Sequence, residues 1–203
     1  MSPTTSTPSP WQLALGEGYD ALHPRLRAYF GSIPPGSVGR GQGVFDVVGT
    51  PRRWLWPAFA ALASAQVLFP VWQKQVAFTV LNTPGEALTA ERTFAFAAGD
   101  RTMLDAVRWS DGRLHDVLGS PQRVCVRLSA TVVDGELHLA STGSWLIFAG
   151  VRLPIPPPLA PRMNLVESIG ADDRQHVAFT LTAPLIGTLY EYRGSFDYRI
   201  EAA

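Results

Sequence analysis

From residue 74 onward, hydrophobic and polar residues alternate along the chain with a period of two. Such alternation is typical of β-strands that have one buried and one exposed face. It predicts nine strands in this part of the chain, at residues 75–81, 88–97, 101–109, 113–118, 123–133, 136–148, 164–169, 175–183 and 188–200. Asp-Gly pairs at 111–112 and 134–135 lie between alternating runs, where they favour tight hairpin turns.

The connections between these strands indicate an antiparallel sheet. A further alternating run at 44–48 brings the number of predicted strands to ten. No helical pattern of useful length separates the strands after residue 74, whereas parallel strands need long crossover connections. The sequence therefore predicts a mainly β (α+β) fold, which is a strongly curved antiparallel sheet or a closed β-barrel of about ten strands with N-terminal helices packed against it.

The N-terminal part of the chain has a different pattern. Residues 1–10 are rich in serine, threonine and proline and are expected to form a disordered tail. We expect residues 11–203 to form a single domain. Its first part, residues 11–73, is expected to be helical with one strand, and residues 74–201 to be antiparallel β structure.

Residues 11–30 carry apolar residues at helical spacing. The recurring positions are Leu15, Tyr19, Leu22, Leu26 and Phe30. Pro24 can break or restart a helix, so one or two short helices are predicted here. The segment 31–43 is rich in glycine and proline and predicts a loop.

Residues 52–74 (RRWLWPAFAALASAQVLFPVWQK) contain no charge between their terminal basic residues. Pro57 and Pro70 bracket a predicted helix at 57–69, which spans about 20 Å at ~1.5 Å per residue. Because a hydrocarbon core is ~30 Å thick, the pattern disfavours a membrane span and favours a core helix packed against the sheet. The alternative is a lid or interfacial helix that leaves an apolar face and its tryptophans at an opening.

Residues 151–161 (VRLPIPPPLAP) predict an irregular segment, because proline cannot donate a ladder hydrogen bond. This segment is expected to be a loop or a crossing along a sheet edge. Its apolar residues indicate packing over another surface, such as the mouth of the barrel. A stiff connector that covers a sheet edge is the alternative.

Charge and cysteine content exclude some classes of protein. The 17 Lys and Arg residues balance 17 Asp and Glu residues, so no nucleic-acid partner is expected. Cys125 is the sole cysteine, which rules out an intrachain disulfide and favours a reducing compartment. The first ten residues lack the basic and apolar regions of a secretory signal, and we expect a cytoplasmic protein.

Common cofactor and catalytic motifs are absent from the sequence. The GRGQG segment at 39–43 has the wrong spacing for a dinucleotide-binding turn and precedes a predicted strand. There is no GxSxG nucleophile motif. The four histidines are isolated in sequence, and the chain has no HxH, HExxH or CxxC motif that would hold a metal ion. The sequence therefore predicts no cofactor and no metal, and it leaves open whether the protein is an enzyme.

Several charged residues lie on the apolar faces of predicted strands. The period of two places Arg92 among phenylalanines, and it places Asp105, Asp116 and Glu167 among aliphatic residues. An unpaired charge in such a position has an effective cost of several kcal/mol. We therefore expect Arg92 to pair with Glu167, Asp116 or both on the concave face of the sheet, with tyrosine hydroxyls completing the network.

This inward-facing cluster has two interpretations. It can be a buried ion pair that fixes strand register, or it can be the polar part of a mostly apolar ligand pocket. In the second interpretation the candidate ligand-binding residues are Arg92, Phe94, Phe96, Asp116, Trp145, Glu167, Tyr190 and Tyr192. The candidate general acids or bases among them are Asp116, Glu167 and Tyr192.

The order of several short motifs resembles an uncharacterised bacterial domain family. These motifs are LHPRLR, GRGQG, ERTF, RLHDVLG, a VDG turn, AGVRLP, LVES and IGTLYEYRG, and they span roughly residues 12–200. The recurring elements of the family match Arg92 with Phe94, Gly150 to Pro154, Glu167, and Tyr192 to Gly194. The family often has Glu where this chain has Asp116, so the resemblance does not extend to that residue.

The resemblance implies no activity, because none is established for the family. Its members occur alone or fused behind saccharopine-dehydrogenase-like reductase domains. This arrangement implies a possible reductase partner, for which the domain would present a substrate or handle a lipid.

Three functions follow from the sequence. The first is a soluble binding domain for a hydrophobic small molecule, lipid-like or isoprenoid, on the concave face of the sheet. The second is an enzyme that acts on such a ligand by carboxylate or tyrosine acid–base chemistry. The third is an interaction module whose strand edge or tryptophan-rich helix docks onto a partner reductase or makes transient contact with a membrane surface, without a transmembrane span.

Overall fold

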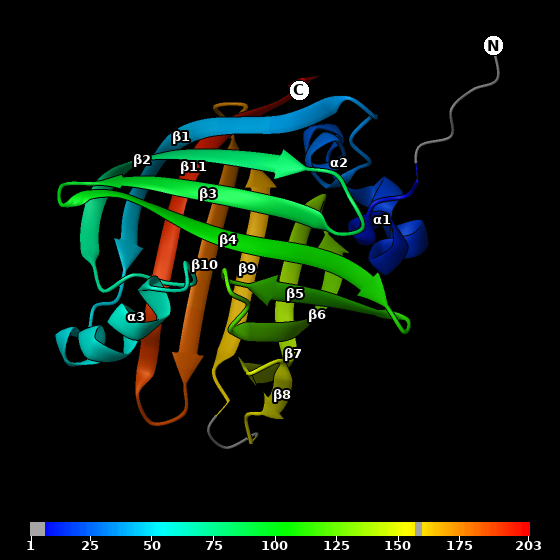
Figure 1. The fold of residues 1–203 in the computed structure, drawn as a ribbon. Helices are drawn as coiled ribbons and strands as arrows, with labels where there is room; N and C mark the ends of the chain where they lie inside the picture. The colour runs from blue at the N-terminus through cyan, green and yellow to red at the C-terminus, as the bar shows by residue number, and fades with distance from the viewer. Residues whose placement is uncertain (1–6, 157–159) are drawn as a thin grey trace, which may run out of the picture.

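The computed structural model describes residues 7–156 and 160–203, and its strands close into a ten-stranded antiparallel β-barrel with one additional short strand (Figure 1). The strands are β1 (Ser37–Gly49), β2 (Trp72–Thr83), β3 (Leu88–Phe96), β4 (Gly99–Ser110), β5 (Arg113–Leu118), β6 (Val124–Val133), β7 (Glu136–Phe148), β8 (Val151–Pro154), β9 (Arg162–Ile169), β10 (Gln175–Ala183) and β11 (Gly187–Ala202). The predicted mainly β fold is confirmed, in its closed form.

The barrel is a meander that closes on itself. Each strand from β1 to β7 pairs with the next, β9 pairs with β7 and β10, and β11 pairs with both β10 and β1. The short strand β8 pairs only with β7. Because all pairs are antiparallel, the connections between strands alternate between two ends of the barrel.

Three short helices close one end of the barrel, which we call the α2 end. They are α1 (Pro10–Leu15), the 3₁₀ helix η1 (Gly16–Ala21) and α2 (Pro24–Phe30). The helical spacing at 11–30 therefore predicted helices correctly, and Pro24 lies in the first turn of α2, where a missing N–H costs nothing. The His23 N–H donates to the Gly135 carbonyl, which ties α2 to the β6–β7 turn.

The expected tail at 1–10 overlaps the start of α1. Ser9 caps this helix in a capping box with Gln12, and its hydroxyl also donates to the Phe30 carbonyl. These bonds fix Ser9 and Pro10, the last two residues of the expected tail, at the start of α1. Residues 1–6 lie outside the part of the chain that the structure describes.

The opposite end, which we call the α3 end, carries η2 (Arg53–Leu55) and α3 (Trp56–Ala63) in the β1–β2 connection (Figure 1). The helix predicted at 57–69 is therefore too long, since it ends at Ala63. The next residues bond to β4 and to the β5–β6 connection: the Leu104 N–H donates to the Gln66 carbonyl at 3.0 Å, and the Ser120 N–H donates to the Ala65 carbonyl at 2.9 Å. These tertiary hydrogen bonds replace the helical ones. None of the helices in the described residues is long and apolar enough to cross a membrane.

The segment at 39–43, which was expected to belong to a loop, forms part of β1. The glycines here do not form a turn, and they allow the backbone and rings of β11 to lie close to β1. A Cβ atom at Gly43 would collide with the backbone of Ser195 and Phe196 on β11, and one at Gly39 would collide with the Tyr198 ring. Composition alone pointed to a loop because glycine is rare in strands, but the curved barrel needs small residues where neighbouring strands and rings come close.

The proline-rich segment at 151–161 also contains a short strand. Its first four residues form β8, an edge strand that makes a hairpin with β7. Ile155 and Pro161 line the interior cavity described below, as expected for a segment that packs over the mouth of the barrel. Residues 157–159 lie outside the described residues.

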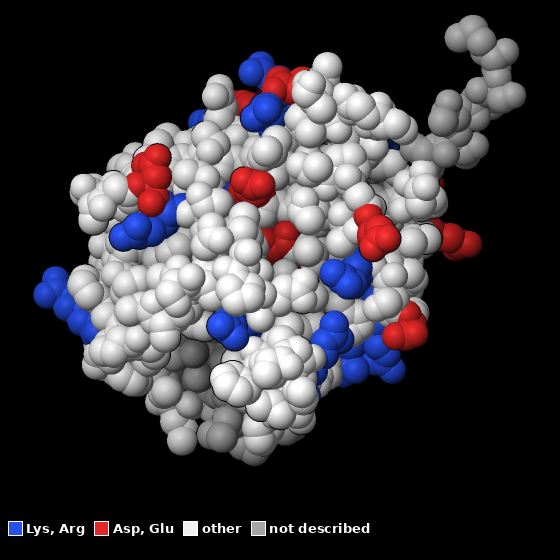
Figure 2. Space-filling model, viewed as in Figure 1, with Lys and Arg blue, Asp and Glu red and all other residues white. Residues whose placement is uncertain are grey.

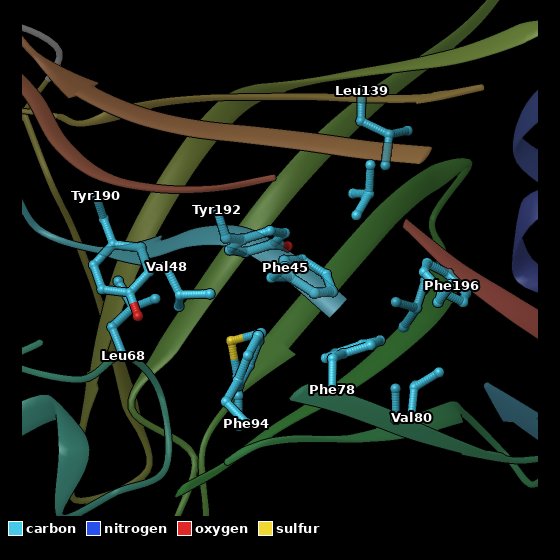
Figure 3. Packing of buried hydrophobic residues seen from close by; sticks show 14 of the residues in the cluster. Phe45, Val48, Leu68, Phe78, Val80, Phe94, Leu139, Tyr190, Tyr192 and Phe196 are labelled. Carbon is cyan, nitrogen blue, oxygen red and sulfur yellow. The ribbon is translucent and has the colours of Figure 1, made fainter. Parts of the chain in front are cut away.

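Aromatic rings fill one part of the barrel interior (Figure 3). The ring centroid of Phe45 lies 4.4 Å from that of Phe78, 5.5 Å from that of Phe94 and 5.6 Å from that of Tyr192. Such tilted and edge-to-face pairs stabilise a core beyond the burial of their area. The remaining part of the interior is not filled, and it forms the candidate site.

Candidate functional site

An apolar cavity of about 230 Å³ lies inside the barrel. This volume is just below the range of about 300–1,000 Å³ that is typical of small-molecule pockets. Most of its wall is aliphatic and comes from β3, β4, β6, β7, β9 and β10. The apolar wall includes Ala90, Met103, Val107, Val126, Leu128, Leu139, Met163, Leu165, Phe179 and Leu181. Several polar side chains interrupt this wall.

Arg92 is the central polar residue of the cavity, and its ion-pair partner is Asp105. We had expected Glu167 or Asp116 in this role, so that part of the prediction is wrong. In the β3–β4 ladder Arg92 lies opposite Met103, so Asp105 is its diagonal neighbour on the same face. The Asp105 side chain is only 3% exposed, and Arg92 therefore neutralises a deeply buried carboxylate.

The Arg92 guanidinium also lies within electrostatic reach of the other predicted groups. Its burial acts against the charged form, but the oxygens of Tyr29, Tyr192 and Asp116 outweigh this effect and raise the pKa of Arg92. Arg92 in turn acts to lower the pKa of Asp116 and of Glu167. The predicted inward-facing network is therefore present, although its direct ion pair is a different one.

Asp116 lines the cavity from β5, opposite Val126 on β6. Burial raises the pKa of its carboxyl to about 6, although the charge of Arg92 acts in the opposite direction. Among the described residues, its buried Oδ1 atom has no hydrogen-bond partner. A buried acceptor without a partner costs about 1–3 kcal/mol, which a ligand donor or a water molecule would recover.

Glu167 lines the cavity from β9 and is itself buried. The Gln175 side-chain amide donates a hydrogen bond to its Oε2 atom. Burial raises the pKa of Glu167 to about 7, and this effect outweighs the Gln175 hydrogen bond and the charge of Arg92. Near neutral pH, this carboxyl is therefore divided between its protonated and ionised forms.

Two tyrosines complete the polar group, one from a helix and one from a strand. Tyr29 comes from α2 and Tyr192 from β11, and both line the cavity. Burial raises the pKa of Tyr29 to about 12 and also raises the pKa of Tyr192, so both hydroxyls keep their protons. The Tyr192 ring stacks on Phe179 with a centroid distance of 4.5 Å.

Four of the predicted ligand-binding residues do not line the cavity. Phe94, Phe96 and Tyr190 are buried in the adjoining core, where Phe94 and Phe96 stack at 5.9 Å. Trp145 lies on the opposite face of β7 from Ser144 and Leu146, with the Arg127 guanidinium 5.6 Å from its ring centroid. Contacts from these four residues to a ligand stay a prediction.

Sequence reasoning missed several polar residues at this site, including Ser144, which lines the cavity from β7. Tyr29 and Asn82 line the cavity, and Gln175 holds Glu167. The Asn82 amide donates to the Tyr198 hydroxyl at 3.3 Å, while its buried Oδ1 has no partner among the described residues. Tyr29 belongs to a helix, and its inward direction depends on which end of the barrel that helix covers. The strand alternation did contain the signal for Asn82, which shares a face of β2 with Val80.

The cavity extends toward the α3 end of the barrel. Leu62 of α3, Val67, Leu118, Leu146 and Ile155 all line it there. Leu146 is 48% exposed, so it belongs both to the cavity wall and to the outer surface. This part of the cavity wall therefore reaches the outer surface beside Leu146, near α3 and the β5–β6 connection.

The chemistry of the site is that of a carboxyl-containing apolar pocket. Within the described residues, no cluster of three His, Cys, Asp or Glu side chains is arranged to hold a metal ion. The protonated forms of Glu167 and Asp116 can donate hydrogen bonds, and their ionised forms can accept them or take up a proton. The arrangement can therefore hold one polar atom of an otherwise hydrophobic molecule.

Comparison with known proteins gives one family and one curated relative. A family model described as a domain of unknown function (DUF4166) matches residues 22–196. The uncharacterized protein YndH of Bacillus subtilis (strain 168) is 28% identical over 138 residues, which are 61% of this chain and 65% of the relative. This chain thus spans less than two thirds of the length of that relative. No solved structure matches the chain. Fusion to a reductase domain stays a prediction.

Proposed function

Because the chain belongs to the family of the domain of unknown function DUF4166, its function has to be inferred from its own cavity, and we propose that it binds a compact hydrophobic molecule inside the barrel. The observation that supports this proposal most directly is an unfilled apolar cavity with an unpartnered carboxylate oxygen, that of Asp116. A barrel that needed Arg92 only for register would be expected to fill this space with side chains, since protein interiors are close-packed.

The aliphatic wall favours a lipid-like or isoprenoid body. The cavity volume of about 230 Å³ suits a short or folded hydrocarbon chain better than a long one. Met163 and Met103 add flexible side chains that can adapt to irregular ligand shapes. Binding would then derive mainly from the apolar area that the ligand removes from water.

The polar residues favour a neutral polar end on the ligand, such as a hydroxyl or a carbonyl. Arg92 is already paired with Asp105, so it has no free charge to neutralise a ligand carboxylate. Asp116 and Glu167 would repel such a carboxylate when they are ionised. A hydroxyl, in contrast, can donate to the free Oδ1 of Asp116, and a carbonyl can accept from protonated Glu167.

The binding test compares ligands that share a hydrocarbon body. Native mass spectrometry of gently purified protein would first identify any ligand retained from the cell. Equilibrium uptake would then be measured with geraniol and geranic acid, and with fatty alcohols, fatty acids and retinoids of increasing length. We expect geraniol to bind at least about tenfold more tightly than geranic acid, which corresponds to ~1.4 kcal/mol. An interior that takes up none of these compounds would refute the proposal.

A matched pair of variants locates the binding site. Val126 lines the cavity, whereas Val44 lies on the outer surface of the barrel, so Val126→Trp fills the cavity and Val44→Trp adds the same side chain outside. We expect Val126→Trp to abolish uptake and Val44→Trp to preserve it. Equal uptake by the two variants would place the ligand elsewhere.

Acid–base catalysis on the bound molecule is a second candidate function. Two carboxyls with pKa values of about 6 and about 7, those of Asp116 and Glu167, face the same cavity as Tyr192 and are suited to proton transfer near neutral pH. The test follows the bound compound by mass spectrometry during incubation with the wild type and with Asp116→Asn, Glu167→Gln and Tyr192→Phe. Turnover that all three variants retain, or a ligand that the wild type leaves unchanged, excludes this function.

A further inference from the structure

The exposed apolar residues of the barrel gather at the α3 end. Of the twelve large hydrophobic residues exposed in the described chain, eight belong to the connections of this end or to the adjoining strand ends. These eight are Trp54, Trp56, Trp72, Leu146, Phe148, Val151, Leu153 and Leu185. Trp54 is 62% exposed and Phe148 is 70% exposed, although both are large and apolar. Exposed apolar groups that gather at one end of a protein in this way mark an interaction surface.

Basic residues surround these apolar groups, and acidic ones are almost absent. The connections of the α3 end and the adjoining strand ends carry the cations Arg52, Arg53, Lys74, Arg101, Arg123, Arg152 and Arg162. Their acidic residues in the described chain are Asp100 and Asp116, and Asp116 faces the cavity. We call the eight apolar residues and these seven cations the basic rim. On the face shown in Figure 2, the surface over α3 is free of red side chains and has blue ones at its margin.

The hairpin turns at the α2 end, in contrast, are acidic. Every one of them contains at least one acidic residue, namely Glu86, Asp111, Asp134, or the pair Asp172 and Asp173. The zero net charge of the chain therefore hides a separation of charge between the two ends of the barrel. Among residues 7–156 and 160–203, none of the seven rim cations forms an ion pair, so their charge is available to a partner.

Hydrogen bonds hold the parts of the basic rim together. Arg52 donates from Nε to the Thr188 carbonyl at 3.1 Å, which joins the α3 connection to the β10–β11 hairpin that carries Leu185. The Ile147 N–H donates to the Arg123 carbonyl at 2.7 Å and joins the β5–β6 connection to β7. The connections that carry the exposed groups are therefore hydrogen-bonded to neighbouring parts of the barrel.

We propose that the basic rim docks onto the surface of an anionic phospholipid bilayer. Tryptophan, phenylalanine and leucine side chains insert favourably at the boundary between headgroups and acyl chains, and arginine binds the phosphates. A symmetric dimer through this surface is disfavoured, because two such rims would bring like charges together. The opening of the cavity beside Leu146 lies at the same end, so docking would place it against the lipid.

Vesicle flotation tests this proposal without any knowledge of the ligand. The wild type is expected to float with vesicles of phosphatidylcholine and phosphatidylglycerol, and to bind pure phosphatidylcholine vesicles at least about tenfold more weakly. Raising the salt concentration from about 0.1 M to about 0.5 M should weaken binding, because the Debye length shortens. Absence of binding to anionic vesicles at low salt would overturn the proposal.

Paired variants compare the two ends of the barrel. The double variant Trp54→Ser/Trp56→Ser and the double variant Arg53→Glu/Arg152→Glu should each lose at least about tenfold in vesicle binding. The controls are Val133→Ser and Arg113→Glu, which change exposed residues at the α2 end and should float like the wild type. Equal losses in rim and control variants would also overturn the proposal. So would a wild-type dimer or protein complex that the rim variants disperse without any vesicle binding.

The two proposals can fail separately. Trp54→Ser/Trp56→Ser should keep equilibrium uptake of a dissolved ligand while losing flotation. Val126→Trp should lose uptake while keeping flotation, because its side chain fills the interior and leaves the surface unchanged.

Discussion

Arg92 forms its ion pair with Asp105 across the β3–β4 hairpin, although the residue directly opposite Arg92 is Met103. The pair is diagonal, and it leaves the guanidinium within electrostatic reach of Asp116 and Glu167. One arginine therefore compensates one deeply buried carboxylate and partly offsets the burial of two others. This arrangement explains why the cavity tolerates three carboxyl groups within an apolar wall.

Removing the charge of Asp105 should strongly destabilise the fold. In Asp105→Asn the Arg92 guanidinium loses its direct partner while staying inside the barrel, and breaking a buried pair in this way costs about 3–5 kcal/mol. Denaturant unfolding of the purified variant measures this change. Asp100→Asn, on an exposed part of the same strand, should change the free energy of unfolding by less than about 0.5 kcal/mol. A loss below ~1 kcal/mol for Asp105→Asn would mean that Asp116 and Glu167 replace the pair.

The raised pKa of Glu167 should make the fold less stable as the pH rises. Its ordinary value is 4.5 and its folded value is about 7, so between these values the native state binds more protons than the unfolded chain. The free energy of unfolding should fall through this window by as much as about 3 kcal/mol. In Glu167→Gln this loss should disappear, and the variant should exceed the wild type in stability at pH 8 but not at pH 5.

Chemical denaturation at both pH values tests the contribution of Glu167. Glu91→Gln is the matched control, because Glu91 is exposed and should leave the pH dependence unchanged. Asp116 adds a smaller fall in the free energy of unfolding as the pH rises from its ordinary pKa of 3.8 to its folded pKa of about 6. Asp116→Asn should remove this fall. A wild-type and a Glu167→Gln curve with the same slope would show that Glu167 has an ordinary pKa.

Substitution of Gly43 should disrupt the contact between β1 and β11. The new methyl group in Gly43→Ala would collide with the backbone of Ser195 and Phe196, and we expect a loss of at least about 3 kcal/mol. Gly18→Ala is the matched control, since a Cβ atom at Gly18 meets nothing within 4 Å. Thermal unfolding followed by circular dichroism compares the two variants, and equal melting temperatures would contradict the packing described.

Cys125 should react slowly with thiol reagents in the native protein. It is fully buried, and burial raises the pKa of its thiol. We expect labelling by an aromatic disulfide at pH 8 to be at least about a hundredfold slower than in denaturant, because the thiol is covered on the face of β6 opposite the cavity-lining Val124 and Val126 and must first be uncovered by local opening. An exposed reference thiol, Val133→Cys in a Cys125→Ala background, should react at once. Equally fast reaction of native Cys125 would place it at the surface.

The sequence was sufficient to locate most of the strands, but it did not locate the first part of β1 or the end of α3. Alternation located β2 to β7 and β9 to β11 because each has one face in the barrel and one outside. The same rule failed at residues 39–43, where glycines serve the close approach of β11 and leave no alternation to read. It also overextended the helix after Ala63, since carbonyl groups in the next turn bond to β4 and the β5–β6 connection instead.

The site was predicted at the level of which side chains face inward. Arg92, Asp116, Glu167 and Tyr192, which the period of two turns inward, line one cavity, and their role as a site stays a prediction. Choosing Asp105 as the partner of Arg92 required the register of the β3–β4 hairpin, and its turn sequence does not fix that register. The unfilled volume could not be predicted either, because it depends on how wide the closed barrel is and on how far the side chains reach across it.

The pairing of β1 with β11 joins the first strand of the barrel to the last one, over twelve register positions from Ser37 with Ala202 to Gly49 with Glu191. During synthesis, β1 and β10 therefore present unsatisfied edges to the surrounding solution until β11 has left the ribosome. Such edges invite pairing with other nascent chains, and closure over so long a separation in sequence is slow. Production of this protein in a cell thus depends on how well the nascent chain is protected from aggregation before β11 closes the barrel.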